Sequence, residues 1–367
     1  MTYILMNGDT PTLKFNLEEF YLEVLENSML PYELKDYIQT TTGASDIKKM
    51  FTDITVLKDY FVSRTINLSR DHAKAILLSA NMPQSSKTEE RLKIVFACRG
   101  LSMTDNFWIK SLDEEVCFSD VNLRNHKLSE ASYDIAILGK HISATADELQ
   151  PDLSTNGMFP KFWRREADEI YMWKTDKTSN FTNTICEIEA SQILRDNHVP
   201  SVEYIKSVKG DKVFSVSKNI ASDDISVIRA LSIRDWCEHT SRDFLAFVGE
   251  QYLTAFANMC VADYVIANTD EHIENWHFLV DSASNEIIGL APLFDFNHAL
   301  VADYSSTDID NLIYEPTGLT FQKTIEKYAR YSSVKFNIAG LPKKCKIRWE
   351  KVEQCKTQET VNSIEIF

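Results

Sequence analysis

The segment from Asn268 to Leu279, NTDEHIENWHFL, gathers ionisable side chains at the end of an apolar stretch. Asp270 and Asn275 stand close together in it, and Val265 and Ile266 precede it. A carboxylate and an amide at this spacing could orient a hydroxyl nucleophile and hold a hard divalent cation. The ordinary alternative is a solvated turn. Which of these two interpretations holds depends on the residues that the rest of the chain places beside Asp270 and Asn275.

Three more residues have the types that phosphoryl transfer requires. Lys174 ends a predicted strand, Glu187 lies in the next predicted helix, and Asp295 follows a predicted hairpin. A strand lysine can hold the phosphates of ATP, and a helix glutamate can keep that lysine in place. Asp270 could accept the proton of the attacking hydroxyl, while Asn275 and Asp295 hold Mg²⁺. Each residue alone is commonplace, but their order along the chain indicates an ATP- and Mg²⁺-dependent phosphotransferase.

A loop before the lysine strand could contact phosphates. It reads STNGMFPK and contains one glycine, Gly157. Backbone N–H groups in such a loop can approach phosphate oxygens. A plain turn explains the same residues, because one glycine is much less than a full GxGxxG pattern.

The acidic motif has a competing interpretation, as an HD-type metal phosphohydrolase. Its ligands would be Asp270, His272, Asp295 and His298. Histidine and carboxylate bind Zn²⁺, Mn²⁺ or Fe, but such histidines usually lie on helices, whereas His298 follows a hairpin. Otherwise His272 either holds the catalytic loop or is an ordinary core histidine. Glu271 and Glu274 are predicted to be solvated neighbours.

Length, charge and cysteine content limit the classes to which this protein can belong. The chain has 367 residues, 44% of them hydrophobic, which is enough for a large core and two or three structural units. A net charge of −15 disfavours a general binder of nucleic acid or anionic membranes, since both need a basic surface. The 7 cysteines form no CxxC pair, which fits a reduced, cytoplasmic protein. Neither a signal peptide nor a membrane span is predicted.

Hydrophobic patterns predict the elements that must position these side chains. Helical spacing predicts helices over residues 16–30, 46–65, 182–199 and 241–268. Aromatic and β-branched stretches predict strands over residues 159–165, 169–175, 201–208 and 212–220. Short strands and turns are expected over residues 101–129, and a β-hairpin over residues 276–296.

Several segments carry a resemblance to a known family. ANTDEHIENWHFLVD followed by GLAPLFDFNHAL resembles the catalytic core of the HipA-like serine/threonine kinases, a bacterial family that includes the toxin kinases of toxin–antitoxin pairs. DLSTNGMFPKFW and IYMWK are similar to the phosphate loop and lysine strand of HipA-domain proteins from Gram-positive bacteria, and LSMTDNFWIK with FSDVNLRNHKLS to the segment before them. The resemblance spans residues 101–300.

The resemblance implies an α+β fold of the bilobal, protein-kinase-like kind. Residues 1–100 lie outside the resemblance, and their helical spacing predicts an extra, mostly helical N-terminal region. Residues 101–222 would form a β-rich lobe with the phosphate loop, lysine strand and hinge, and residues 223–367 a mainly helical lobe with the catalytic loop and metal-binding hairpin. The implied cofactors are ATP and Mg²⁺. The implied partners are a protein substrate and a separate antitoxin, with no direct nucleic acid and no membrane.

The resemblance also implies a role for each matching residue. Asp270 would be the catalytic aspartate, and Asn275 and Asp295 would bind Mg²⁺. Lys174 would contact the ATP phosphates, with Glu187 as its helix partner.

Five further positions follow from the same match. Ser154 falls where the toxin kinases have an autophosphorylated serine, and Gly157 and Lys161 belong to the same phosphate loop. The backbone of Lys218 and Ile220 would match the adenine-binding hinge.

Three positions depart from the usual pattern of the subgroup. Lys174 is followed by TDKTSNF instead of glycines, Lys218 replaces a common acid, and Glu274 replaces a common basic residue. Glu189 is the second choice for the partner of the strand lysine. These departures keep open the alternative of a nucleotide-binding pseudokinase that regulates a partner.

Overall fold

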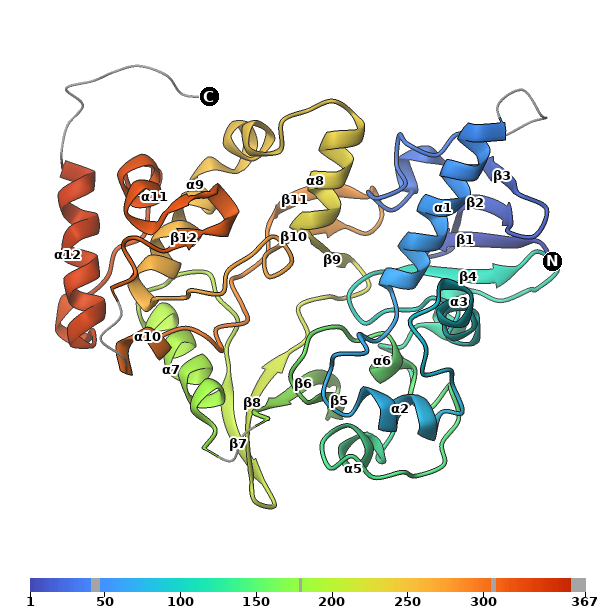
Figure 1. Cartoon of the computed structure of the whole chain (residues 1–367), viewed down its shortest axis with the longest axis horizontal. Coiled ribbons are helices and arrows are strands. Elements are labelled where there is room, and N and C mark those ends of the chain that lie inside the picture. The colour runs from blue at the N-terminus through green and yellow to red at the C-terminus, as the bar shows by residue number, and fades with distance from the viewer. Residues whose placement is uncertain (41–46, 178–179, 305–307, 358–367) are drawn as a thin grey trace. The chain divides into compact units, whose positions relative to one another are not determined.

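The fold contains both helices and strands, arranged in two compact units (Figure 1). The computed structural model describes residues 1–40, 47–177, 180–304 and 308–357. Unit 1 comprises Met1–Lys177, Lys218–Ile228 and Leu279–Ile288. Unit 2 comprises Thr178–Ser217, Arg229–Phe278 and Gly289–Phe367. Both units are therefore built from segments that are distant in the sequence.

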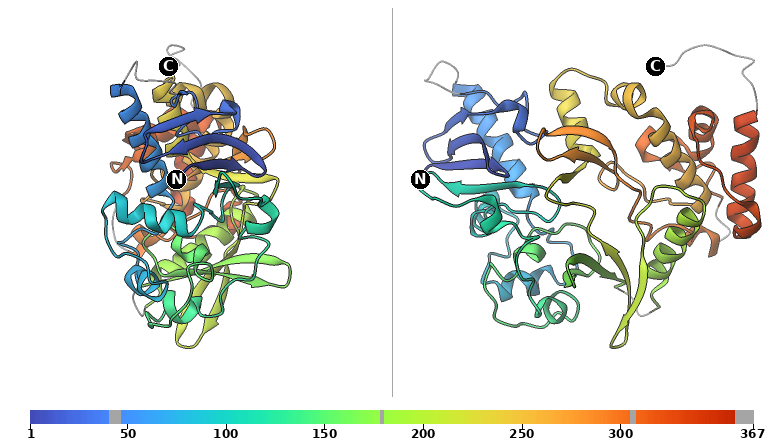
Figure 2. Two further views of the ribbon diagram at one scale, coloured as in Figure 1. Left: turned by 90° about the vertical axis from the view of Figure 1, so that its right-hand side faces the viewer. Right: turned by 180° about the vertical axis from the view of Figure 1, so that it is seen from behind.

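Unit 1 begins with an antiparallel sheet in the order β3-β2-β1-β4. Its strands are β1 (Tyr3–Asn7), β2 (Thr10–Asn16), β3 (Tyr21–Val24) and β4 (Phe107–Ser111). Helix α1 (Ile47–Ser63) packs on this sheet, with the rings of Phe61 and Phe15 5.2 Å apart (Figure 2). Helices α2 (Ala73–Ser79) and α3 (Thr88–Ala97) complete the first 100 residues.

The helix predicted over residues 16–30 is wrong, so residues 1–100 are not mostly helical. The side chain of Asn16 accepts hydrogen bonds from the backbone N–H groups of Glu18 and Glu19, which turns the chain back on itself. Leu22 then enters the sheet core opposite Phe15 and is fully buried. Pairing of β3 with the preceding strand β2, and burial in the sheet core, outweigh the local helical spacing. The helix predicted over residues 46–65 is confirmed by α1.

The rest of unit 1 is built from short elements. They are α4 (Phe118–Val121), α5 (Ser132–Ala136), α6 (Gln150–Leu153), and the hairpin of β5 (Lys161–Glu166) and β6 (Glu169–Thr175). A second sheet has the order β11-β10-β9. Its strands are β9 (Ile225–Arg229), β10 (His277–Asp281) and β11 (Glu286–Leu290). The predicted strands of this region are confirmed, except that residues 118–121 form a helical turn.

Unit 2 is mainly helical and is organised around α9 (Phe244–Ile266). Its other helices are α7 (Thr182–Asp196), α8 (Ala230–His239), α10 (Val301–Tyr304), α11 (Phe321–Tyr328) and α12 (Lys343–Thr357). Its strands are the hairpin β7 (Ile205–Lys209) and β8 (Lys212–Lys218), and the short pair β12 (Ile313–Tyr314) and β13 (Leu319–Thr320).

Helix α9 is apolar on nearly all sides in its C-terminal half because other helices surround it. Residues Met259 to Ile266 are all buried. Both long helices predicted for this part of the chain, α7 and α9, are confirmed. No helix within the described residues is both long enough and apolar enough to cross a membrane.

Candidate active site

The acidic motif forms a loop between α9 and β10 of unit 2. Helix α9 ends at Ala267, whose φ of 51° is left-handed and turns the chain sharply. The Asn275 side-chain amide donates to the backbone carbonyl of Asp270 at 2.9 Å. The Asp270 carboxylate lies at the surface, with half of its side chain exposed. The structure therefore brings Asp270 and Asn275 into one closed turn.

The remaining polar residues of the loop hold its shape. The backbone N–H of Glu274 donates to Nδ1 of His272 at 3.2 Å, so His272 stabilises the loop. Glu274 itself is exposed, as predicted. The first N–H groups of α8 also donate to loop carbonyls, from Ala230 to Trp276 and from Leu231 to Ile273.

The prediction that Glu271 is solvated is wrong. Its side chain is buried, and Oε2 accepts a hydrogen bond from the amide of Asn268 at 2.8 Å. Burial and the nearby Asp263 raise the pKa of this carboxyl well above its usual range. The turn at Ala267 is the reason, because it folds the loop back over the end of α9, where Asp263 lies.

Asn268 anchors the loop to the helix, a role that sequence reasoning missed. Its amide nitrogen donates both to Glu271 and to Oδ1 of Asp263, at 2.8 and 3.2 Å. The hydroxyl of Tyr314 donates to the other Asp263 oxygen at 2.5 Å. Burial raises the pKa of Asp263 to about 7. The only sequence signal was the position of Asn268, which opens the motif at the end of an apolar helix.

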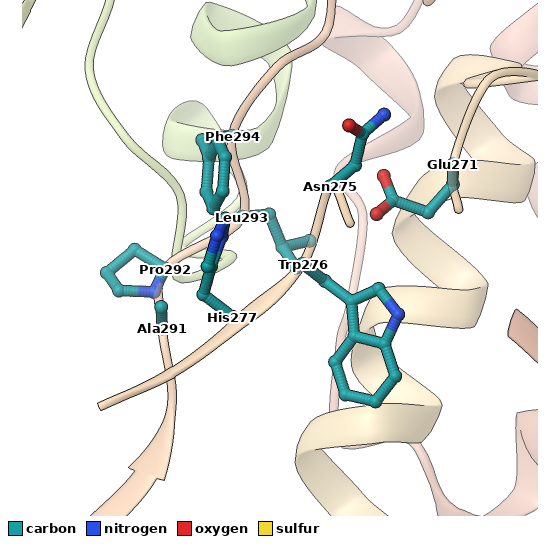
Figure 3. A pocket seen from close by; sticks show the side chains of 8 residues that line it. All are labelled: Glu271, Asn275, Trp276, His277, Ala291, Pro292, Leu293 and Phe294. Atoms are coloured by element: carbon teal, nitrogen blue, oxygen red, sulfur yellow. The ribbon is translucent and has the colours of Figure 1, made fainter. Parts of the chain in front are cut away.

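A small pocket lies beside this loop (Figure 3). The His277 ring stacks on Phe294 with centroids 4.7 Å apart. Burial and Arg229 lower the pKa of His277 to about 3, so its ring is neutral at physiological pH. The side chains of Glu271 and Asn275 line the same pocket. The pocket therefore combines an amide and a carboxyl group with an aromatic wall.

Asp295 lies in the same part of unit 2. Its carboxylate contributes to the raised pKa of Glu271. Its φ of 62° is left-handed, which is uncommon for a residue other than glycine. Nε2 of His298, three residues on, is 3.7 Å from the Asp270 carboxylate. The structure thus places Asp270, Asn275 and Asp295 around one region.

The ligand set of the phosphohydrolase hypothesis does not assemble. Among the residues that the structure describes, no group of three or more His, Cys, Asp or Glu side chains could hold a metal ion. His298 is close to Asp270, but Nδ1 of His272 faces the N–H of Glu274 instead. This geometry gives that hypothesis no support.

The helix glutamate is buried in unit 2. Glu187 on α7 is fully buried and accepts a hydrogen bond from the hydroxyl of Ser215 on β8. Glu189, the second choice, is exposed. Of the two candidate glutamates, Glu187 is therefore the one held inside unit 2.

The lysine strand and phosphate loop belong to unit 1. Lys174 is mostly buried, and its ammonium lies 5.2 Å from the centre of the Phe159 ring. Lys161 stands directly opposite Lys174 in the β5–β6 hairpin. Gly157 has a φ of 92°, and a Cβ there would lie 2.3 Å from Nζ of Lys161. The lysine ammonium therefore sits against the glycine backbone, in space that a side chain would fill.

The phosphate loop rests on the N-terminal region through Arg70, a contact that sequence reasoning also missed. The Arg70 side chain is fully buried and donates to the backbone carbonyls of Asp152, Thr155 and Lys161. Its guanidinium is 3.5 Å from the Asp152 carboxylate. The hydroxyl of Ser154 donates to carbonyls of the preceding helical turn, at 3.1 and 3.2 Å.

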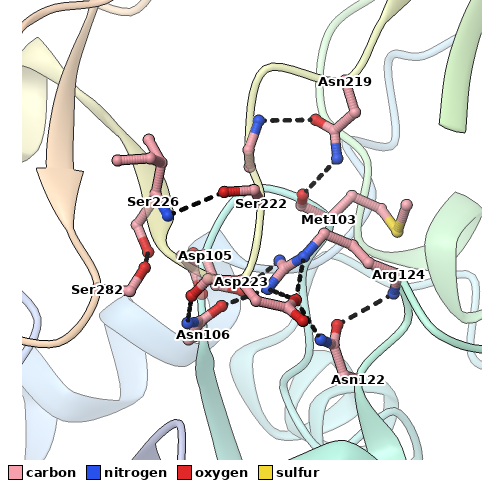
Figure 4. Close-up of polar contacts among 12 residues, drawn as sticks. Met103, Asp105, Asn106, Asn122, Arg124, Asn219, Ser222, Asp223, Ser226 and Ser282 are labelled. Carbon is pink, nitrogen blue, oxygen red and sulfur yellow. Dashed lines mark hydrogen bonds and ion pairs between the residues drawn. The ribbon is translucent and has the colours of Figure 1, made fainter. Parts of the chain in front are cut away.

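A polar network in unit 1 holds the segment that follows β8, which includes the Asn219 amide bound to the carbonyl of Met103 (Figure 4). The Lys218 ammonium pairs with Glu169 at 2.6 Å, and Ile220 follows in the loop after β8. Asp223 accepts hydrogen bonds from the side chains of Asn122 and Arg124. These two residues come from the FSDVNLRNHKLS segment, which gives that segment a structural role.

Comparison with known proteins yields similarity in structure only. No family model matches the chain, and no curated protein matches its sequence. The fold is similar to a chain of the HipA, HipB and operator DNA complex of the toxin–antitoxin system of Shewanella oneidensis MR-1, with a TM-score of 0.54 and 12% identity over 97% of this chain and 95% of that one. A proinflammatory kinase, CtkA of Helicobacter pylori, matches at a TM-score of 0.39 and 16% identity, over 55% of this chain and 88% of that one.

Proposed function

We propose that this chain, which shares the fold of the HipA structure, is an ATP- and Mg²⁺-dependent serine/threonine protein kinase of the HipA type. The observation that carries the proposal is the closed turn in which the Asn275 amide binds the carbonyl of Asp270. Such a turn fixes a carboxylate and an amide oxygen at one place, as a phosphotransferase requires.

The residues present fit a magnesium ion. The Asn275 amide nitrogen is used within the turn, which leaves the amide oxygen to act as a ligand. The Asp295 carboxylate would be the second ligand, and oxygen atoms are what Mg²⁺ prefers. Bound Mg²⁺ would neutralise negative charge on the phosphates of ATP.

Asp270 would act on the substrate. Its exposed carboxylate can accept a hydrogen bond from a protein hydroxyl, orient that hydroxyl and take its proton. Glu271 is buried beneath the loop, whereas Asp270 is open to solvent, and the Asn275 amide binds the backbone of Asp270. The side chain is therefore suited to meet a large partner.

The phosphate contacts would come from the β5–β6 hairpin and the loop before it. Lys174 and Lys161 would contact the phosphates, with Gly157 and the Ser154 turn beside them. Glu187 would orient Lys174, and the backbone of Lys218 and Ile220 would meet the adenine ring. In this proposal the lobes are residues 101–222 and 223–367, in a bilobal arrangement, and residues 1–100 support the phosphate loop.

The partners and location that we propose are based on the same structural similarity. The similar structure contains HipA together with HipB and operator DNA. For this chain we infer a protein hydroxyl as phosphate acceptor, a separate antitoxin as partner, and a cytoplasmic location.

Transfer of labelled phosphate from ATP tests the proposal. Wild-type protein should label itself or a protein in a cell extract in the presence of Mg²⁺, and Asp270→Ala should reduce the rate by about 100-fold or more. Glu274→Ala, which removes an exposed acid of the same loop, is the matched control and should retain activity. ATP binding without any transfer by the wild type would instead support a pseudokinase.

A further inference from the structure

Tyr204 lies immediately before β7, where its backbone and its ring are both held in place. Its backbone N–H donates to the hydroxyl of Ser191 on α7 at 3.2 Å. Its ring meets Phe296 edge to face, with centroids 6.1 Å apart. A tyrosine held at both its backbone and its ring presents its hydroxyl at a defined position.

The hydroxyl of Tyr204 faces two groups of the candidate site. It accepts a hydrogen bond from the backbone N–H of Asp295 at 3.1 Å. It also hydrogen-bonds to the Glu187 carboxylate. A hydroxyl can donate and accept at once, so donation to Glu187 and acceptance from Asp295 are compatible. Burial and the two neighbouring carboxylates raise the pKa of this hydroxyl well above its usual range, so it keeps the proton that it donates.

The segment that carries Asp295 needs such support. The φ of 62° at Asp295 is strained for an aspartate, and strained residues persist only where their surroundings fix them. Backbone hydrogen bonds tie Leu293 to Pro200 and to Val202, at 2.9 and 2.8 Å. Tyr204 adds the next contact along the same pair of segments, directly at the strained residue.

We propose that Tyr204 is a positioning residue that couples Glu187 of α7 to the metal-binding turn at Asp295. The proposal rests on the proposed function, in which Asp295 is a Mg²⁺ ligand. Glu187 then has a second task besides orienting the strand lysine, because it also orders the turn that presents Asp295. The chain of contacts runs from Ser215 through Glu187 and Tyr204 to the backbone of Asp295.

Replacing the hydroxyl tests the coupling. Tyr204→Phe keeps the ring against Phe296 and removes both hydrogen bonds. Mn²⁺ is titrated into the protein with a non-hydrolysable ATP analogue, and free Mn²⁺ is measured by electron paramagnetic resonance. Affinity for Mn²⁺ should fall about five- to tenfold, the amount expected for one or two lost hydrogen bonds. Hydrogen exchange at the Asp295 amide, measured without metal or nucleotide, should become faster.

Tyr264→Phe is the matched control. Tyr264 is also buried, and its hydroxyl bonds to a carboxylate, that of Asp310, at 2.7 Å. This variant should lose stability without changing Mn²⁺ affinity or exchange at Asp295. If Tyr204→Phe behaves like Tyr264→Phe in both measurements, the coupling is refuted.

Two further variants separate this coupling from the proposed function. Asp295→Asn should abolish most Mn²⁺ binding. If it does not, Asp295 is no metal ligand, and the proposed metal site fails together with the coupling. If Tyr204→Phe does not fold, Glu187→Gln should weaken Mn²⁺ binding in the same direction, and unchanged binding would refute the coupling while Asp295→Asn still reports on the metal site.

Discussion

The proposed phosphate loop of unit 1 and the proposed catalytic loop of unit 2 are held by opposite kinds of buried group. The phosphate loop surrounds a cation, Arg70, which binds three carbonyls and faces the Asp152 carboxylate. The catalytic loop rests on two acids, Asp263 and Glu271, which share the amide of Asn268. The first anchor pairs opposite charges, whereas the second brings two acids together, so the second should depend more strongly on pH between 4 and 7.

The largest effect on stability is expected at the cationic anchor. Arg70→Met should lower the free energy of unfolding by about 3–5 kcal/mol, because it leaves the buried Asp152 carboxylate without its counter-charge. Urea unfolding checks this value. Adding Asp152→Asn to the same variant should recover part of the loss, and a single variant as stable as wild type would contradict the contrast between the anchors.

The acidic anchor should be the next most sensitive. Asn268→Ala removes the donor that both Asp263 and Glu271 use, so it should cost about 2–3 kcal/mol of unfolding free energy. The loss should be larger at pH 7.5 than at pH 5, because Asp263, whose pKa is raised to about 7, is ionised in a larger fraction of molecules at pH 7.5 and an ionised carboxylate depends more on its donor. Thermal unfolding at the two pH values measures both effects, and equal losses would argue against a shared acid pair.

The pH dependence itself distinguishes the two anchors. Asp263 has a pKa raised to about 7, so the folded state holds its proton more tightly than the unfolded state. Stability should therefore fall as pH rises from about 4 to about 7, by at most about 1.4 kcal/mol per pH unit for this group. Asp263→Asn should flatten that slope in urea titrations. Glu274→Gln, at an exposed acid, should leave the slope as it is.

The smallest effect is expected at the exposed pair formed by His298 and Asp270, the proposed catalytic aspartate. His298 and Asp270 are 3.7 Å apart, but both side chains are about half exposed, where such pairs contribute little. His298→Gln should therefore change the rate of phosphate transfer less than about fivefold. A loss of activity as large as that of Asp270→Ala would revive a metal-ligand role for His298.

The sequence predicted best the parts of the site whose contacts are local. Asp270 and Asn275 meet within one turn, and the periodicity of α9 places that turn at the end of a buried helix. Arg70 and Tyr204 escaped prediction because their partners lie 82 and 91 residues away. No spacing rule pairs residues at such distances, and an arginine or a tyrosine alone carries no signal of its partner.

The two wrong predictions, the helix over residues 16–30 and the exposed Glu271, have a related cause. Residues 16–30 have helical spacing, but Leu22 gains more from the sheet core than a solitary helix would provide. Glu271 was expected in solvent because acids are mostly exposed, and only the left-handed turn at Ala267 carries it inward. In both cases tertiary packing overrides a rule that holds for local sequence, namely helical spacing for residues 16–30 and the usual exposure of acids for Glu271.

Gly157 limits which sequences its loop can accept. A side chain there would meet the ammonium of Lys161, and the φ of 92° would strain any L-residue at this position as well. A replacement therefore has to move a positive charge and carry a backbone penalty at the same time. In a variant library, most substitutions at residue 157 should for that reason lower the yield of folded protein as well as shift the charge of the loop.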